Sequence, residues 1–246
     1  MLRGEKIETE LPGAIRLRTP AGDSPPLAVH RPGRLAYERA LELQEELVRR
    51  KLDGEAGDHL LLLEHEPVYT LGRGARAQDL LGADRRLGVP VHRVGRGGGV
   101  TYHGPGQLVA YPIISLGAYG RDVHRYIRTL ESISAAVLRR FGVEAAARPG
   151  LTGVWVEQRK IASIGVGVRR WVTFHGVALN ISADLAYFRA IVPCAMPEVM
   201  MTSMEIELGA APPMVAVESA FEACFRDAFG YAASSDSEAL HPRGTS

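Results

Sequence analysis

The segment that decides the fold covers residues 154–181 and reads VWVEQRKIASIGVGVRRWVTFHGVALNI. Three stretches within it, residues 154–156, 161–168 and 171–181, are rich in β-branched and aromatic residues, which favours strands. The polar residues between these stretches, 157–159 and 169–170, are typical of turns. The segment therefore predicts a meander of antiparallel strands.

Helical and strand patterns alternate irregularly around this meander. Apolar residues at helical spacing predict helices over residues 34–51, from an N-cap at Asp122 to about residue 140, and over residues 213–229. Shorter apolar runs predict strands over residues 60–63, 89–94 and 108–115, and residues 184–191 favour a helical turn. This pattern indicates an α/β fold with a mixed sheet flanked by helices rather than a regular βαβ alternation.

The composition excludes several classes of protein. The chain has 246 residues, 46% of them apolar, and a net charge of +1, which gives no whole-chain argument for binding nucleic acid or an anionic membrane. The N-terminal sequence MLRGEKIETELPG lacks the apolar region of a signal peptide, and no run reaches the ~18 apolar residues of a membrane helix. We therefore expect a cytoplasmic protein with reduced thiols, in which residues 1–33 are extended or loosely ordered.

The most unusual stretch is glycine-rich: Arg96-Gly97-Gly98-Gly99-Val100-Thr101-Tyr102-His103-Gly104-Pro105-Gly106-Gln107. Three successive glycines carry an entropic cost that is explained where backbone must approach a ligand closely, although a flexible surface hairpin is an alternative interpretation. No Gly-Lys-Ser/Thr follows, so the stretch is not a Walker loop. Residues 72–77 match G-x-G-x-x-A, but the segment after them is too short for the crossover helix of a dinucleotide fold.

The two cysteines, Cys194 and Cys224, differ in their surroundings. Cys224 lies at core spacing on the last predicted helix, which favours a small buried hydrophobic residue. Cys194 follows a proline in a loop, where a nucleophilic thiolate needs a nearby cation to lower its pKa. Lys160 is a candidate for that cation, because the chain contains only two other lysines, Lys6 and Lys51. Without further information, an inert loop cysteine and a solvated turn lysine remain the alternatives.

Other possible sites receive little support from residue spacing. His65, His92, His103 and His175 show neither H-E-x-x-H nor another metal-ligand spacing. Ser163 lacks the first glycine of the G-x-S-x-G motif, which argues against a hydrolase nucleophile elbow.

Four blocks of the sequence together resemble the lipoyl(octanoyl) transferase family, and the resemblance extends from about Leu27 to Gly230. The blocks are the glycine-rich stretch 96–107, residues 159–165 followed by 174–180, the pair Pro193-Cys194, and residues 67–73. One departure is Ala195, because the family usually has glycine after the cysteine.

The resemblance implies a catalytic fold like that of lipoate and biotin protein ligases, with a smaller subdomain. It implies one catalytic domain over residues 27–230. From their composition, we expect residues 1–26 to be a poorly ordered or extended segment and residues 231–246 to be a mobile polar tail. The implied reaction moves an octanoyl group from octanoyl-acyl carrier protein to a lysine of lipoyl domains or glycine cleavage H protein, the first step of endogenous protein lipoylation. No ATP, metal or other cofactor is implied, and we expect a monomer.

The resemblance also implies roles for individual residues. Cys194 would carry the acyl group as a thioester, and Lys160 would lower the pKa of Cys194. The acyl pocket would be lined by Arg96, Gly97, Gly98, Gly99, Val100, Thr101, Tyr102, His103, Ser163, Ile164, Gly165, Gly176, Val177 and Ala178.

Elementary chemistry agrees with these roles. Transfer of an acyl group from a thioester to an amide lowers the free energy. A cysteine nucleophile predicts ping-pong kinetics. A lysine can exchange a proton near neutral pH, where an arginine cannot. Local arginines such as Arg139, Arg140, Arg169 and Arg170 could steer acidic carrier domains, or they could be solvated surface residues. The alternatives are an ATP-dependent lipoate–protein ligase of the same fold, a non-catalytic module that binds acylated carriers, and a redox protein based on residues 72–77.

Overall fold

The fold is built on one large mixed sheet. The computed structural model describes residues 26–82, 87–192 and 199–232. The strands of the large sheet lie in the order β1 (Leu27–Leu35), β2 (Asp58–His65), β6 (Gln107–Ile113), β10 (Val172–Asn180), β9 (Arg159–Arg169), β8 (Leu151–Val156) and β7 (Ala146–Arg148), and β11 (Met200–Met201) pairs with β9. The β1–β2 and β9–β11 pairs are parallel and the others are antiparallel, which confirms the predicted mixed sheet.

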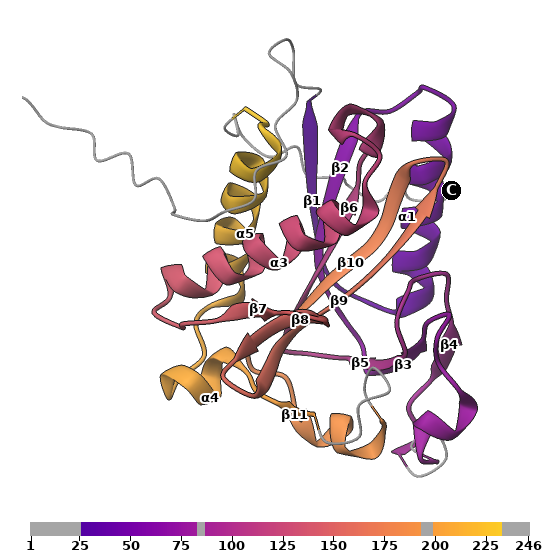
Figure 1. Ribbon diagram of the computed structural model, residues 1–246. Helices are drawn as coiled ribbons and strands as arrows, with labels where there is room; N and C mark the ends of the chain where they lie inside the picture. Colours follow the sequence, from indigo (N-terminus) through magenta and orange to yellow (C-terminus); the bar gives the residue numbers. More distant parts are fainter. Residues whose placement is uncertain (1–25, 83–86, 193–198, 233–246) are drawn as a thin grey trace, which may run out of the picture.

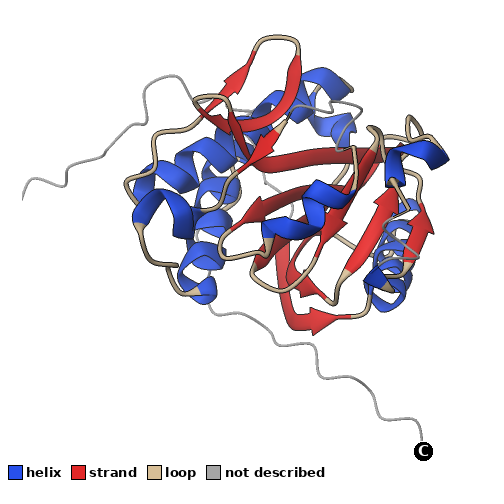
Figure 2. Ribbon diagram, turned by 90° about the horizontal axis from the view of Figure 1, so that it is seen from below, coloured by secondary structure: helices blue, strands red, loops and turns tan. Residues whose placement is uncertain are grey.

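Helices cover both faces of this sheet. The helices α3 (Val123–Arg140) and α5 (Met214–Phe229) lie on one face, and α1 (Tyr37–Leu52) lies on the other (Figure 1). The view from below shows the same layers end-on (Figure 2). The core between the sheet and α3 and α5 contains Leu60, Leu62, Val177 and Phe225, and a second core lies beneath α1.

A smaller sheet of three strands forms the predicted subdomain. Its order is β4 (Val91–Arg93), β3 (Val68–Leu71) and β5 (Val100–His103), and the short helix η1 (Ala77–Leu80) follows β3 in the chain. The short helix η3 (Leu185–Ala190) packs against this sheet, where Phe188 joins Tyr69 and Tyr102 in a third apolar cluster. The other short helices are η2 (Leu116–Tyr119) and α4 (Met204–Leu208).

The predicted meander is confirmed as β8, β9 and β10. The β9–β10 register pairs Arg169 with Val172, so Arg170 and Trp171 form a two-residue turn in which both have positive φ (46° and 67°). Tight hairpins favour this backbone geometry because it matches the twist of the strands. The Asp122 cap is confirmed as well, since its carboxylate accepts the backbone N–H of Arg125 at 2.9 Å.

Two expectations near the N-terminus of the described chain are wrong. Residues 27–33 do not form a loosely ordered segment, because they belong to β1 and pair with β2. The first helix begins at Tyr37 rather than Arg34, because Arg34 and Leu35 continue the strand opposite Glu64 and His65. The division of the chain at residues 26 and 231 stays a prediction, because residues 1–25 and 233–246 lie outside the described residues.

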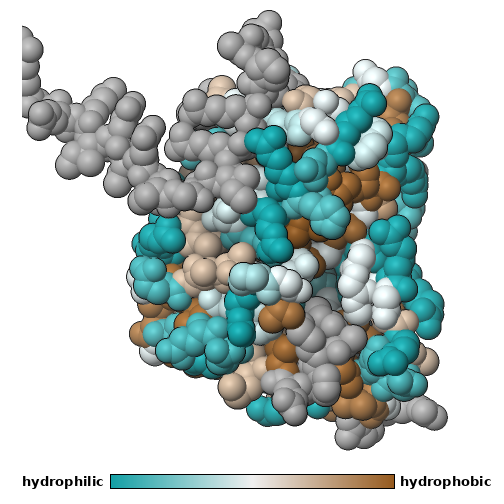
Figure 3. All heavy atoms as spheres, in the orientation of Figure 1, coloured by the Kyte–Doolittle hydropathy of each residue, from teal (hydrophilic) through white to brown (hydrophobic). Residues whose placement is uncertain are grey.

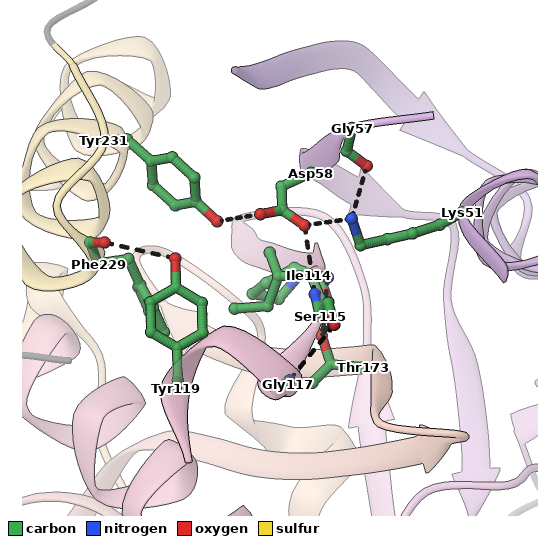
Figure 4. A network of polar contacts seen from close by, with 11 residues as sticks. Lys51, Gly57, Asp58, Ile114, Ser115, Gly117, Tyr119, Thr173, Phe229 and Tyr231 are labelled. Atoms are coloured by element: carbon green, nitrogen blue, oxygen red, sulfur yellow. Dashed lines mark hydrogen bonds and ion pairs between the residues drawn. The ribbon is translucent and has the colours of Figure 1, made fainter. Parts of the chain in front are cut away.

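A buried carboxylate ties the two helical layers together. Asp58, at the start of β2, accepts the ammonium of Lys51 from the end of α1 at 2.6 Å. The backbone N–H of Ser115 donates to the same oxygen, Oδ1, and the other oxygen, Oδ2, accepts the hydroxyl of Tyr231, just after α5, at 2.7 Å (Figure 4). One carboxylate therefore connects elements from opposite faces of the sheet.

The surface is mixed in polarity. Figure 3 shows teal hydrophilic residues interspersed with smaller brown apolar areas on the face seen in Figure 1. The exposed large apolar side chains include Met200 and Ile206, which lie on β11 and α4. Among the helices of the described ranges, none combines the length and apolar composition needed to span a bilayer.

Candidate functional site

A pocket lies where the glycine-rich segment meets β9 and β10. It encloses about 440 Å³, part of it open to solvent. Its lining consists of Tyr37, Arg96, Gly98, Thr101, His103, Tyr111, Ser163, Ile164, Gly165, His175, Gly176, Val177 and Ala178. The structure thus brings together most of the residues that the sequence analysis named for an acyl pocket; Gly97, Gly99, Val100 and Tyr102 are not part of the lining.

Alternation along β5 explains why two of those residues lie elsewhere. Thr101 and His103 face the pocket, whereas Val100 and Tyr102 point into the apolar cluster of the small sheet. The ring of Tyr102 stacks on Tyr187 with centroids 4.4 Å apart and an interplanar angle of 3°. Tyr102 therefore supports η3 rather than the pocket wall.

The glycines allow two sheets to approach each other closely. The N–H of Gly97 donates to the carbonyl of Val166 on β9 at 2.9 Å, and the N–H of Gly74 donates to the carbonyl of Gly98 at 3.0 Å. A Cβ atom at Gly165 would lie 2.9 Å from Cδ of Arg96, and Gly98 has a φ of +83°. The glycine-rich stretch is therefore a close-packed junction between the sheets, not a flexible surface hairpin.

Arg96 holds this junction from inside. Its guanidinium donates to the carbonyl oxygens of Gly97 and Gly99, both at 3.0 Å, and to the carbonyl and hydroxyl of Thr70 at 2.7 and 2.8 Å. The side chain is almost fully buried while still lining the pocket. Arg96 therefore fixes the glycine backbone and also supplies a positive charge at the pocket wall.

Histidine and tyrosine side chains surround one part of the pocket. His65 contacts the hydroxyl of Tyr111 through Nε2 at 2.8 Å, and the ring of Tyr37 lies 5.1 Å from that of His65 and 6.4 Å from that of His103. Burial lowers the pKa of His65 to about 4, and burial together with Arg96 and His65 lowers that of His175 to about 3. Burial also raises the pKa of Tyr37 to about 12. These groups are therefore polar but uncharged at neutral pH.

His175 has the most unusual conformation in the pocket. It is a non-glycine residue within a strand, yet its φ is +55°. Its backbone N–H donates to the side-chain carbonyl of Gln44 on α1 at 2.8 Å, and its Nε2 is buried without a hydrogen-bond partner. Helix α1 thus supports a strained backbone position that directs this imidazole to the pocket.

Sequence reasoning missed Tyr37, Tyr111 and His175 as lining residues. A signal was present for two of them, because Tyr37 and Gln44 lie at core spacing on the first helix, and Tyr111 interrupts an apolar strand. Polar residues at positions that periodicity assigns to the core are candidates for a site. Residue spacing alone could not show that His65 and His103 would come together.

Lys160 lies on the same strand as Ser163 and Gly165 but outside the pocket lining. The alternative of a solvated turn residue is wrong, because only 1% of Lys160 is exposed. Its Nζ lies 5.3 Å from the ring centroid of Trp155, and its carbonyl accepts the N–H of Thr202 at 2.9 Å. Cys194 falls outside the described residues.

A buried chain of hydrogen bonds links the region of Lys160 to the pocket. Thr202 accepts from the side-chain amide of Asn180 at 3.0 Å, and Asn180 accepts from Gln107 at 3.0 Å. Gln107 contacts Nδ1 of His103 at 2.8 Å, and Nε2 of His103 lies 3.3 Å from the hydroxyl of Thr70. The two sheets are therefore joined by polar contacts as well as by the glycines.

Two other predicted features are structural. Cys224 is buried in the core on α5, as predicted, and burial raises the pKa of its thiol. The G-x-G-x-x-A match at residues 72–77 is followed by the one-turn helix η1 rather than a crossover helix. Within the described ranges, no group of three or more His, Cys, Asp or Glu side chains is arranged to hold a metal ion.

Comparison with solved structures supports the fold. A crystal structure of lipoate-protein ligase A bound with ATP aligns over 87% of this chain and 88% of its own, with a TM-score of 0.69 and 18% identity. A putative lipoate protein ligase from T. acidophilum aligns over 82% of this chain and 85% of its own, with a TM-score of 0.68 and 16% identity. At this identity the likeness establishes the shared fold.

Comparison with known sequences establishes the family. The family described as the lipoyl protein ligase A/B catalytic domain matches residues 36–226. A protein named octanoyltransferase from Geobacter metallireducens is 50% identical over 182 residues, which cover 74% of this chain and 84% of that protein. Another octanoyltransferase, from Rubrobacter xylanophilus, is 48% identical over 204 residues, covering 81% and 91% of the two chains. The chain therefore belongs to the octanoyltransferases, enzymes with the lipoyl protein ligase A/B catalytic domain.

Proposed function

We propose that the enzyme takes an octanoyl group from octanoyl-acyl carrier protein and transfers it to a lysine ε-amine of lipoyl domains and of glycine cleavage H protein. The transfer passes through a thioester on Cys194. The observation that carries this proposal is a pocket with apolar walls at Ile164, Val177 and Ala178, on the same sheet as the buried Lys160.

The first step forms a thioester on the enzyme. The thiolate sulfur of Cys194 attacks the thioester carbonyl of the donor, and the bond from that carbon to the phosphopantetheine sulfur breaks. The departing thiolate takes up a proton from the ammonium of Lys160, which becomes neutral, and leaves with the carrier protein. In this proposal the ammonium of Lys160 acts on Cys194 and favours the thiolate form that this step needs.

The second step releases the product. The ε-amine of the acceptor lysine attacks the enzyme thioester, an amide bond forms, and the bond to the cysteine sulfur breaks. The attacking amine must lose a proton, and Lys160 accepts it in its neutral form. Because both steps use energy already stored in the donor thioester, the reaction needs no ATP.

The chain connections on either side of Cys194 support this pairing. Before the cysteine, the N–H of Val192 donates to the carbonyl of Asp79 at 2.7 Å, which connects this point to η1, the short helix after β3. After it, Met201 pairs with Lys160 in the β9–β11 ladder. Cys194 lies in sequence between an anchor on the small subdomain and an anchor at Lys160.

The pocket offers a binding surface suited to an alkyl chain. The lining includes the apolar residues Ile164, Val177 and Ala178, while Gly98, Gly165 and Gly176 allow the backbone to approach a bound chain. We assign the acyl pocket to the lining residues that the sequence analysis named. The other four residues that the sequence analysis named support the lining without being part of it: Gly97, Gly99, Val100 and Tyr102.

One experiment tests the mechanism. The protein is incubated with octanoyl-acyl carrier protein in the absence of ATP, and the peptide containing Cys194 is examined by mass spectrometry. We expect a hydroxylamine-labile octanoyl adduct that is absent in Cys194→Ala, slow to form in Lys160→Ala and unchanged in the matched control Cys224→Ala. Full transfer without modification of Cys194 would overturn the mechanism, and ATP-dependent activity of Cys194→Ala would favour a ligase.

We also propose that the enzyme acts as a monomer, because one cysteine and one lysine from the same chain complete the reaction. Light scattering should give the mass of a single chain. A stable dimer whose dissociation abolishes transfer would contradict this proposal.

A further inference from the structure

The side chain of Lys160 lies against an indole ring inside the protein. Its Nζ is 5.3 Å from the ring centroid of Trp155, and the two residues are direct partners across the β8–β9 ladder. Cζ of Arg148 lies at the same distance from this centroid, so the indole interacts with two cations. An indole face attracts an ammonium electrostatically, and the attraction is stronger where water is excluded.

A glycine provides the space beside the lysine. A Cβ atom at Gly153 would lie 2.5 Å from Cε of Lys160, 3.1 Å from Nζ and 2.6 Å from the carbonyl oxygen of Ala162. Gly153 also has a φ of +126°, a conformation that other residues rarely adopt. Position 153 therefore accommodates the lysine only while it has no side chain.

Gly153 is in turn held by a buried carboxylate. Its backbone N–H donates to Oε1 of Glu131 on α3 at 2.9 Å, and Arg128 donates to the other oxygen of that carboxylate at 2.7 Å. The side chain of Glu131 is fully buried, so this anchor is protected from competition with water.

We propose that Gly153, Trp155 and Glu131 are positioning residues that together form a socket for the ammonium of Lys160. The indole of Trp155 forms one wall of the socket. Gly153 has no side chain and so leaves room for the lysine, and Glu131 holds the backbone of Gly153 in place. The inference rests on the proposed function, in which Lys160 acts on Cys194. Fixing a flexible lysine in this way avoids an entropic cost during acyl transfer, since a lysine side chain has many rotamers.

The first test reads the socket without any substrate. The chain has only three lysines, Lys6, Lys51 and Lys160, so ¹³C-lysine labelling gives three resolvable sets of side-chain signals in a proton–carbon NMR spectrum. We expect the Cε signals of Lys160 to carry a ring-current shift that disappears in Trp155→Leu. The matched control is Trp171→Leu, which removes the chain's other tryptophan, at the partly exposed hairpin tip.

The second test measures the rate of Cys194 acylation in a single turnover. Displacement of Lys160 in Gly153→Ala should slow acylation by about a hundredfold, the scale expected for misplaced reacting groups. Gly150→Ala is the matched control, because Gly150 also has positive φ (+77°) but nothing within 4 Å of a Cβ atom, so acylation should stay unchanged. Trp155→Leu should lower the acylation rate about tenfold. Trp155→Phe should lower the rate less, since phenylalanine retains an aromatic face.

Glu131 is tested by a conservative pair and by a readout that separates positioning from folding. Glu131→Gln keeps an oxygen that can accept from Gly153 and should retain most activity, whereas Glu131→Ala should not. The pH dependence of Cys194 alkylation by iodoacetamide should shift in Gly153→Ala and Trp155→Leu, because the ammonium is displaced from the position from which we propose that it acts on the thiol. Loss of stability alone would leave this profile unchanged in the folded fraction.

The outcomes distinguish the two proposals. If Lys160→Ala leaves acylation and alkylation unchanged, the proposed role of Lys160 fails regardless of the socket. If Lys160→Ala slows acylation but folded Gly153→Ala and Trp155→Leu match the wild type, only the socket is wrong. An unshifted Lys160 signal in the wild-type spectrum would also overturn the socket.

Discussion

The two faces of the large sheet use the same strands for different purposes. On the face under α3 and α5, β2 contributes Leu60 and Leu62 to an apolar core. On the face under α1, the same strand contributes Leu61 and Leu63, but it ends in His65, whose ring contacts Tyr111. Because side chains alternate across a strand, neighbouring residues in the sequence fall on opposite sides of this division.

The difference shows how the fold holds a polar site without losing its core. Polar groups on the α1 face are mostly partnered: His65 with Tyr111, His103 with Gln107, and Gln44 with the backbone of His175. A buried polar group that has a hydrogen-bond partner lowers the stability of the fold little. Nε2 of His175 has no such partner, so its burial destabilises the folded state. The stability of the apolar face therefore offsets strain on the face that carries the pocket.

The largest expected effect comes from the residue that connects the two layers. Replacement of Asp58 by alanine leaves the ammonium of Lys51 without its carboxylate and removes the acceptor of Tyr231. Removal of one partner of a buried ion pair costs about 3–5 kcal/mol, and we expect this loss in urea unfolding. The double variant Asp58→Ala/Lys51→Met should recover part of it. Equal stability of Asp58→Ala and the wild type would show that the layers are held by apolar contacts alone.

A second prediction uses adjacent leucines to separate the two faces. Leu61 and Leu62 are both fully buried, and Leu61 lies directly opposite Tyr111 in the β2–β6 ladder. Either leucine-to-alanine change should lower the unfolding free energy by about 2–5 kcal/mol, because each leaves a cavity. Only Leu61→Ala should also raise the KM for octanoyl-acyl carrier protein, because Leu61 lies opposite the lining residue Tyr111, whereas the β2–β6 partner of Leu62 is Ala110, which is not part of the lining. Equal KM values in the two variants, assayed well below their melting temperatures, would contradict this division.

Local patterns in the sequence predicted the elements whose stability is mainly local. The meander, the Asp122 cap and the core position of Cys224 follow from residue types and spacing. Strand β1 could not be predicted in the same way, because its sequence LAVHRPGRL contains a proline, a glycine and several charges. It becomes a strand through parallel pairing with β2, which is a long-range contact.

The sequence predicted some residues of the candidate site and missed others. The glycine-rich block and residues 163–165 and 176–178 were found through the resemblance to a family, and the structure gathers most of them around one pocket. Tyr37, Tyr111 and His175 were not found, because they come from three separate elements that only the folded chain brings together. The burial of Lys160 was hidden as well, since Arg159 and a turn precede it in the sequence.

The smallest expected effect is a pH dependence that arises on the α1 face. Burial lowers the pKa of His65 to about 4, against an opposing contribution from its contact with the carbonyl of Leu35 and from Glu38. The folded state therefore stays neutral at His65 as the pH falls, while the unfolded state takes up a proton near pH 6.5. The unfolded state binds more protons between about pH 6.5 and 4, so stability is present above pH 6.5 and is lost through this window.

Substitution of His65 should therefore flatten the acid limb of the stability profile. For one proton, the unfolding free energy falls by about 1.4 kcal/mol per pH unit within the window. Urea unfolding at pH 7, 6 and 5 should show that His65→Gln loses about this much slope, while His124→Gln, at an exposed position on α3, does not. His59 and His175, with pKa values lowered to about 4 and about 3, keep part of the dependence in both variants. Identical slopes in His65→Gln and the wild type would mean that His65 is solvated in the folded state, and the contrast between an uncharged polar face and an apolar face would then fail at its central residue.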